Sequence, residues 1–177
     1  MTILYIASKI LTFPGAYLRG FWEHLTCKLL GLPVEASGYL RFDEACGHIE
    51  HGMTQKGFAS YLMATGPGFM NLMTGFPIFI AGYINLFYMG IRFSDSQGLF
   101  IAYILMTYVG ASLLCNIFPL VEDAMNLYEV AYTQKKMNFL GRIIAFIPTV
   151  ITYAGAYLEK YGITVILWAV FVILSIL

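Results

Sequence analysis

The sequence predicts an all-α membrane protein with four to five transmembrane helices. Of its 177 residues, 59% are hydrophobic and only 11% are charged, and the mean hydropathy is +0.74. A soluble domain carries about a quarter charged residues, so this chain has far more apolar surface than a small globule can bury. The apolar residues also gather in long runs, and a helix of about 20 such residues crosses a bilayer.

Composition also excludes several classes of protein. Ten acidic and ten basic residues give no electrostatic basis for binding nucleic acid. Three cysteines lie far apart, which argues against a disulfide framework and against an all-cysteine zinc site. Lys9 interrupts the apolar N-terminus and no small-residue cleavage site follows, so we expect this segment to be retained rather than removed. No repeat or linker divides the chain, and we expect one integral membrane domain over residues 1–177.

Apolar segments and polar connections alternate along the chain. The first segment contains Phe13-Pro14-Gly15, where proline removes a backbone donor and glycine relaxes φ, so it forms one kinked helix or two shorter ones. The second is longer than a span, with Gly66-Pro67-Gly68 and Pro77 as predicted kink points. An amphipathic segment over 121–136 precedes the last two. The expected spans lie near residues 3–30 (kinked), 58–91, 97–118, 138–158 and 162–177.

Residues 34–56 form the longest polar stretch, which is too charged to span a bilayer and is expected to be a loop. Alternating polarity over Ala36–Phe42 allows a short strand there. Basic residues gather near this loop and near the connection before the fourth span, and these two connections lie on the same side. The positive-inside rule therefore predicts that the loop is cytoplasmic. The residues concerned are Lys28, Arg41, Lys56, Lys135, Lys136 and Arg142.

The most polar segment, Phe42–His51, contains two of the three histidines. His48 and His51 flank Glu50. On a helix, residues three apart share a face, so both imidazoles could reach one metal ion. Imidazole combined with carboxylate suits zinc or another divalent metal. The alternative interpretation is a polar loop beside the membrane with two ordinary histidines.

Further candidates lie within the apolar segments. Glu23 and His24 are adjacent in a mostly apolar helix, and ionisable residues at membrane depth are functional candidates. Alternatively, Arg19 and Glu23 simply pair, because they are four residues apart on a helix near the interface. Asn71 places a polar group at membrane depth, and Asn116 can satisfy backbone groups that a following proline frees.

Asp123 follows Asn116 and Pro119, just after the expected span over 97–118. It lies on the same side of the membrane as the polar segment. Asp123 is either a metal ligand or the N-cap of the following amphipathic helix, which is a frequent role of aspartate.

In this order, the motifs resemble the site-2 protease family of intramembrane zinc metalloproteases and its small uncharacterised prokaryotic relatives. That family carries HExxH on a membrane helix, then a Gly-Pro-x-x-Asn-type element, then Asn-x-x-Pro before an aspartate. Gly66–Asn71 is similar to the second element, and Asn116-x-x-Pro119 with Asp123 is similar to the third. The resemblance implies the cytoplasmic membrane of a prokaryote. The surroundings of the zinc helix are similar in Phe13-Pro14-Gly15, Cys27 and the run from Gly47 to His51.

The HExxH slot itself departs from the family, because it reads Arg19-Gly20-Phe21-Trp22-Glu23. Arginine is a permanent cation and cannot ligate zinc, and glycine cannot act as the general base for a metal-bound water. The family's mechanism therefore does not transfer as written. We expect Arg19, Glu23, Asn71 and Asn116 to line a common pocket.

Three functions remain open. The first is a site-2-protease-like pseudoenzyme, a binding or adaptor subunit in which Arg19 with Glu23 and Asp123 replaces the zinc centre. The second is a metalloprotease with a relocated metal site, and only this one requires zinc. The third is a small transporter component gated by the polar segment. The expected partners are the lipid bilayer and another membrane protein. The relocated site would use His24, His48, His51 and Asp123 as ligands, with Glu23 or Glu50 as the base.

Overall fold

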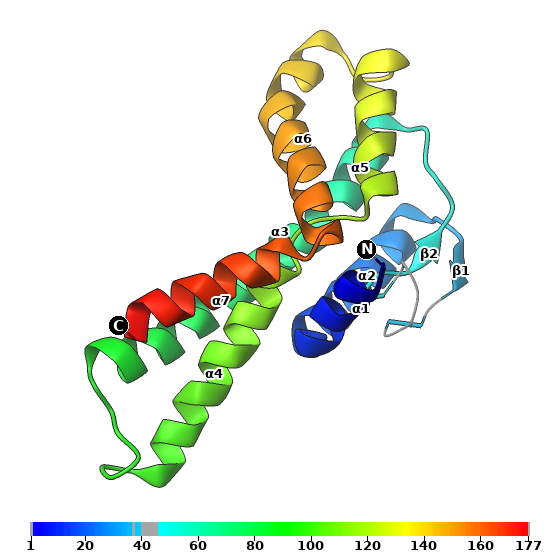
Figure 1. Cartoon of the computed structure of the whole chain (residues 1–177). Coiled ribbons are helices and arrows are strands. Elements are labelled where there is room, and N and C mark those ends of the chain that lie inside the picture. The colour runs from blue at the N-terminus through cyan, green and yellow to red at the C-terminus, as the bar shows by residue number, and fades with distance from the viewer. Residues whose placement is uncertain (1, 37, 40–45, 177) are drawn as a thin grey trace.

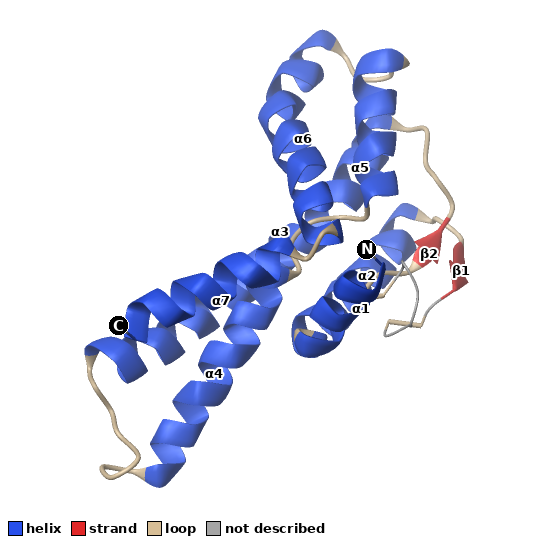
Figure 2. Cartoon of the chain, viewed as in Figure 1, coloured by secondary structure: helices blue, strands red, loops and turns tan. Residues whose placement is uncertain are grey.

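The computed structural model describes residues 2–36, 38–39 and 46–176, and these are mainly helical (Figure 1, Figure 2). The all-α prediction is confirmed. Two single π-helical turns, η1 (Ile84–Tyr88) and η2 (Glu129–Thr133), extend α3 and α5. The helices are α1 (Thr2–Leu11), α2 (Phe13–Leu30), α3 (Gly57–Tyr83), α4 (Gln97–Cys115), α5 (Val121–Tyr128), α6 (Phe139–Lys160) and α7 (Ile163–Ile176).

Three helical segments in the described part of the chain are long and apolar enough to cross a membrane: Gly57–Tyr88, Gln97–Cys115 and Phe139–Lys160. The predicted spans over 3–30 and 162–177 form shorter helices, of 10 and 18 residues in the first case and 14 in the second. These two further spans stay predictions, as does the total of four to five.

The first predicted span is divided at Thr12, one residue before the Phe-Pro-Gly motif. Thr12 leaves the helical region with φ −106° and ψ 37°, and α2 begins at Phe13 with Pro14 in its first turn. A backbone N–H has no partner within the helix at that position, so proline costs nothing there and favours a helix start. Proline therefore begins α2 and does not kink one long helix. Gly31, in the left-handed region with φ 67°, ends α2.

The predicted kink points of the second span do not interrupt its helix. α3 continues through both Pro67 and Pro77, and the regular α-helix ends only where η1 begins. Close packing supports the helix, because α3 and α4 form an antiparallel hairpin with small residues between them. A Cβ on Gly75 would lie 2.6 Å from that of Leu113, and one on Gly110 would clash with the backbone of Phe79. Such small-residue contacts are common between membrane helices.

The polar loop contains a short antiparallel pair of strands, β1 (Val34–Ala36) and β2 (Glu50–His51), with Val34 opposite His51. Within the strand predicted for Ala36–Phe42, residues 37 and 40–42 lie outside the described residues, as do the first four residues of Phe42–His51. Ile49 packs with Cys27 of α2 and Met63 of α3 in a small apolar core. The hairpin is therefore anchored to the helices, and its histidines are held against them.

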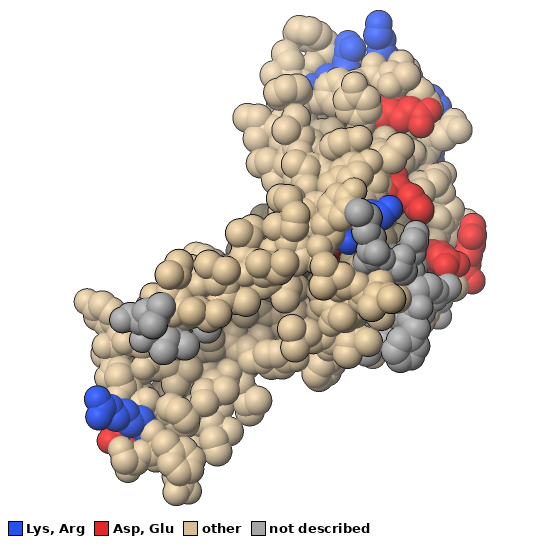
Figure 3. Space-filling view, viewed as in Figure 1, with Lys and Arg blue, Asp and Glu red and all other residues tan. Residues whose placement is uncertain are grey.

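Figure 1 shows α3, α4 and α7 extending together toward one end of the molecule, while α5 and α6 form an arm toward the other. α1, α2 and the strands lie beside the junction of these two groups. Figure 3 shows Lys and Arg at both ends, with an uncharged surface over α4 and α7 on this face. Charged ends that flank an apolar surface are what a membrane protein requires.

Candidate functional site

Arg19 and Glu23 form a buried ion pair on one face of α2. Their spacing of four residues brings Nε of Arg19 to 3.0 Å from Oε1 of Glu23, and the two residues are 0% and 1% exposed. The guanidinium also donates through Nη1 to the carbonyl oxygen of Ile117, at 2.8 Å. α2 is thus joined to the segment between α4 and α5 by a charged hydrogen bond.

Both carboxylate oxygens of Glu23 have further partners in the polar loop. Nδ1 of His48 lies 2.6 Å from Oε1, and the backbone N–H of Ile49 donates to Oε2 at 3.1 Å. His48 precedes β2 and belongs to no helix, so the helical spacing proposed for His48 and His51 is wrong. His48 does lie in the polar loop, but its side chain is buried, at 1% exposed. We call Arg19, Glu23 and His48 the ion network.

His51 contacts a different acid. Its Nε2 lies 3.4 Å from Oδ1 of Asp123, and both side chains are buried. Burial favours the neutral imidazole, but the hydrogen bond and the charge of Asp123 outweigh it and raise the pKa of His51 from 6.5 to about 9. Asp123 lies in the first turn of α5, whose N-cap is Leu120, so the alternative role of Asp123 as an N-cap is wrong. His24 instead contacts the hydroxyl of Tyr39, at 3.3 Å.

Two asparagines form hydrogen bonds between the three segments that carry the Phe-Pro-Gly, Gly-Pro and Asn-x-x-Pro motifs. Nδ2 of Asn71 donates to the carbonyl oxygens of Gly15 at 3.1 Å and of Asn116 at 2.8 Å. Nδ2 of Asn116 donates in turn to Oγ1 of Thr12, at 2.9 Å. Both asparagines are fully buried. The structure therefore brings the Phe-Pro-Gly, Gly-Pro and Asn-x-x-Pro segments into contact, while Gly68 packs against Nη1 of Arg19.

Lys9 and Glu159 form a second buried ion pair, which was not predicted from the sequence. Lys9 is 1% exposed and Glu159 is 4% exposed. Nζ of Lys9 also donates to Oδ1 of Asn116 at 2.8 Å, and Oε2 of Glu159 accepts the backbone N–H of Phe118 at 3.2 Å. A lysine in the last turn of an otherwise apolar helix was itself a signal, because such a charge needs a buried partner.

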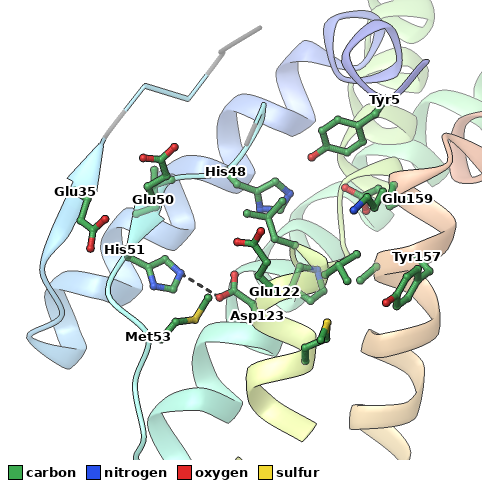
Figure 4. A pocket seen from close by; sticks show the side chains of 17 residues that line it. Tyr5, Glu35, His48, Glu50, His51, Met53, Glu122, Asp123, Tyr157 and Glu159 are labelled. Atoms are coloured by element: carbon green, nitrogen blue, oxygen red, sulfur yellow. Dashed lines mark ion pairs between the residues drawn. The ribbon is translucent and has the colours of Figure 1, made fainter. Parts of the chain in front are cut away.

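A cavity of about 870 Å³ opens beside these groups. Figure 4 shows His51 and Asp123 pointing toward each other in it, with Glu35 and Glu50 to one side and Tyr157 and Glu159 to the other. His48 also lines the cavity, so the ion network and the cavity share a side chain. Residues of α1, α5, α6 and both strands contribute to the lining, and segments far apart in sequence therefore build one pocket.

The candidate ligands do not gather into a metal centre. Among the described residues, no three of His, Cys, Asp and Glu lie together in a way that could hold a metal ion. His48 contacts Glu23, His51 contacts Asp123 and His24 contacts Tyr39. The HExxH slot does not fit zinc either, because Arg19 occupies it and pairs with Glu23.

Fold and site together define a class: a mainly helical chain whose three apolar helices indicate a membrane protein, with a buried ion network beside an open cavity. Comparison with protein-family models, with curated proteins and with solved structures found no match for this chain.

Proposed function

We propose that this protein is a site-2-protease-like membrane protein that lacks the zinc protease mechanism and acts as a binding or adaptor subunit. The observation that carries the proposal is the Arg19–Glu23 pair, at 3.0 Å and almost completely buried. A guanidinium at this position neutralises the carboxylate that a metal ion would otherwise neutralise. His48 and the backbone of Ile49 engage the same carboxylate, which leaves it unsuited to act as a base.

The surroundings of the pair support a retained architecture. Asn71 joins Gly15 to Asn116, and Gly68 lies against Arg19 and Ile117, so the segments that carry the family-like motifs enclose the ion network. Replacing a metal centre with paired charges preserves such packing, because each buried charge keeps a partner.

The cavity is the part of the molecule that supports a binding role. At about 870 Å³ it is large enough for a ligand or for a segment of a partner protein, and its lining is partly apolar and partly charged. Its residues come from α1, from the polar loop, from α5 and from the last turns of α6. We place the polar loop in the cytoplasm, on the distribution of lysine and arginine, and the protein in a prokaryotic cytoplasmic membrane.

Thermal unfolding in detergent tests the absence of a metal centre. A ligand that binds only the folded state stabilises it in proportion to the logarithm of its concentration. We therefore expect the Tm to stay constant when zinc or a strong chelator is added, in the unmodified protein and in the variant H48A/H51A. A Tm that a chelator lowers, and that is insensitive to chelator in H48A/H51A, would instead establish a relocated metal site.

Crosslinking in the membrane tests the binding role. A photoreactive residue replaces Met53 or Met125, which line the cavity, or Met73, an exposed residue of α3 outside it. The proposal predicts a discrete crosslinked product from the two cavity positions and none from Met73. The binding role is contradicted if the cavity positions give only the lipid adducts that Met73 gives.

A further inference from the structure

A second groove lies between the first turns of α3 and α6, away from the cavity. Its volume is about 390 Å³ and its lining is mostly apolar. Phe58 and Tyr61 contribute from α3, Gly141 and Ile144 from α6, and Lys136 lies in the wall just before α6. The start of α3 lies against the segment just before α6, since a Cβ on Gly57 would lie 2.6 Å from Cγ of Met137.

Basic residues surround this groove. Lys136 lines the groove, and Lys135 is its neighbour in the chain. Lys56 is the N-cap of α3, and Arg142 follows the lining residue Gly141 in α6. Within the described part of the chain none of these four forms an ion pair: Nζ of Lys136 donates to a neutral amide, that of Gln55, at 2.8 Å. Nε of Arg142 is buried without a hydrogen-bond partner among the described residues.

One carboxylate lies nearby, that of Glu129, which accepts a hydrogen bond from the side chain of Gln134 at 2.9 Å. Even with Glu129 counted, this end of the molecule is positive. Figure 3 shows the cluster of Lys and Arg at the end of the arm formed by α5 and α6.

The two helices that form the groove indicate where it lies relative to the membrane. Gly57–Tyr88 and Phe139–Lys160 are both candidate membrane spans, and both begin at this end. The groove therefore starts at the level of the lipid headgroups and extends along the first turns of two spans into the hydrocarbon. An apolar groove with cations at its headgroup end matches a phospholipid, and basic pockets between membrane helices on the cytoplasmic side bind anionic lipids.

We propose that this groove binds one anionic phospholipid. An acyl chain lies along Phe58, Tyr61 and Ile144, and the phosphate lies at Lys136 with Lys135 and Lys56 beside it. Charge complementarity identifies the occupant as anionic, and the apolar depth of the groove identifies it as a lipid. The inference is independent of the proposed function, because it uses neither the ion network nor the cavity.

Native mass spectrometry of the full chain in detergent measures the dissociation constants of phosphatidylglycerol and phosphatidylcholine. We expect phosphatidylglycerol to bind more tightly. Removing one interfacial charge weakens such binding about fivefold, so K136Q loses about fivefold and K135Q/K136Q about 25-fold for phosphatidylglycerol. Both variants retain their affinity for phosphatidylcholine, which shows that they are folded.

R92Q is the matched control, because it removes one positive charge at the opposite end of α3–η1 and should leave both affinities unchanged. Soluble glycerol 3-phosphate should not displace the lipid, since it lacks the acyl chain. Equal affinity for the two lipids, an equal loss in R92Q, or full displacement by glycerol 3-phosphate would each overturn the proposal. The last result would instead indicate a site for free phosphate.

Discussion

Arg19 illustrates what a buried charge requires. Removing a guanidinium from water is costly, and the cost is offset only when its partners are close and well oriented. Glu23 provides a carboxylate at 3.0 Å and Ile117 a carbonyl at 2.8 Å. Nη2 has no hydrogen-bond partner among the described residues. The pair therefore holds α2 in one position at a considerable energetic cost, which the surrounding packing must offset.

Removing one member of this pair should destabilise the protein more than removing both. R19M leaves the carboxylate of Glu23 buried beside His48 without its cation, and breaking a buried pair costs about 3–5 kcal/mol. We expect the double variant R19M/E23M to be more stable than R19M, because no buried charge of the pair remains. Denaturant unfolding in detergent measures the free energies. A double variant that is less stable than R19M would contradict this explanation.

The contact of His51 with Asp123 should make stability depend on pH. The folded-state pKa of about 9 lies above the ordinary value of 6.5, so the stabilisation is complete below pH 6.5 and is lost as the pH rises through about 9. Unfolding of the unmodified protein and of H51Q, measured from pH 6 to pH 10, checks this. Their difference in stability should shrink as the pH rises, whereas a constant difference would argue against a protonated His51.

Local spacing made part of the site predictable. Arg19 and Glu23 were expected to pair because residues four apart on a helix face each other, and the structure confirms it. Lys9 and Glu159 are 150 residues apart, and no local pattern identifies such a partner. One of two interpretations put His48 and His51 on one helix face, but the polar loop with its short strands places His48 against Glu23 instead. Both contacts depend on how distant segments of the chain pack together, which local sequence patterns do not reveal.

At the scale of the elements, close approach between helices determines the position of the ion network. The carbonyl of Ile117 lies directly against Gly68 of α3, and Nη1 of Arg19 would be 2.6 Å from a Cβ at this position. A glycine is required here because two other segments occupy the space of a side chain. Pro67 and Pro77 were expected to kink α3; the helix continues through both, and a kink there stays a prediction.

G68A should therefore be strongly destabilising. The added methyl group would clash with the Ile117 carbonyl and displace Arg19, and overpacking of this kind costs about 1–3 kcal/mol or more. G98A is the control, because its Cβ would meet nothing within 4 Å at the start of α4, and alanine there is expected to stabilise by up to about 1 kcal/mol. Thermal unfolding compares them. A G68A protein as stable as G98A would show that the two segments do not pack as described.

At the scale of the whole molecule, the α3–α4 hairpin fixes which ends of the helices share a side. Ser94 lies in the turn between the two helices, whereas Gln134 precedes α6 at the end where α3 begins. Both side chains are exposed. If both helices cross the bilayer, these two positions lie on opposite sides, with Gln134 in the cytoplasm by the positive-inside rule.

Cysteine labelling in intact cells tests this topology. The three native cysteines are buried, so S94C and Q134C report on their own positions. We expect an impermeant maleimide to label S94C from outside and Q134C only after the cells are opened. Labelling of both from outside would exclude a hairpin that spans the membrane, and the reverse pattern would invert the orientation.

We propose that a buried guanidinium–carboxylate network stands where a site-2 protease would hold zinc. Elemental analysis of the purified protein, expressed with zinc in the medium and never exposed to chelator, tests it most directly. We expect a zinc content near zero per chain, unchanged in H48A/H51A. One zinc per chain, lost when His48 and His51 are replaced, would contradict it and establish a metal centre built from different residues.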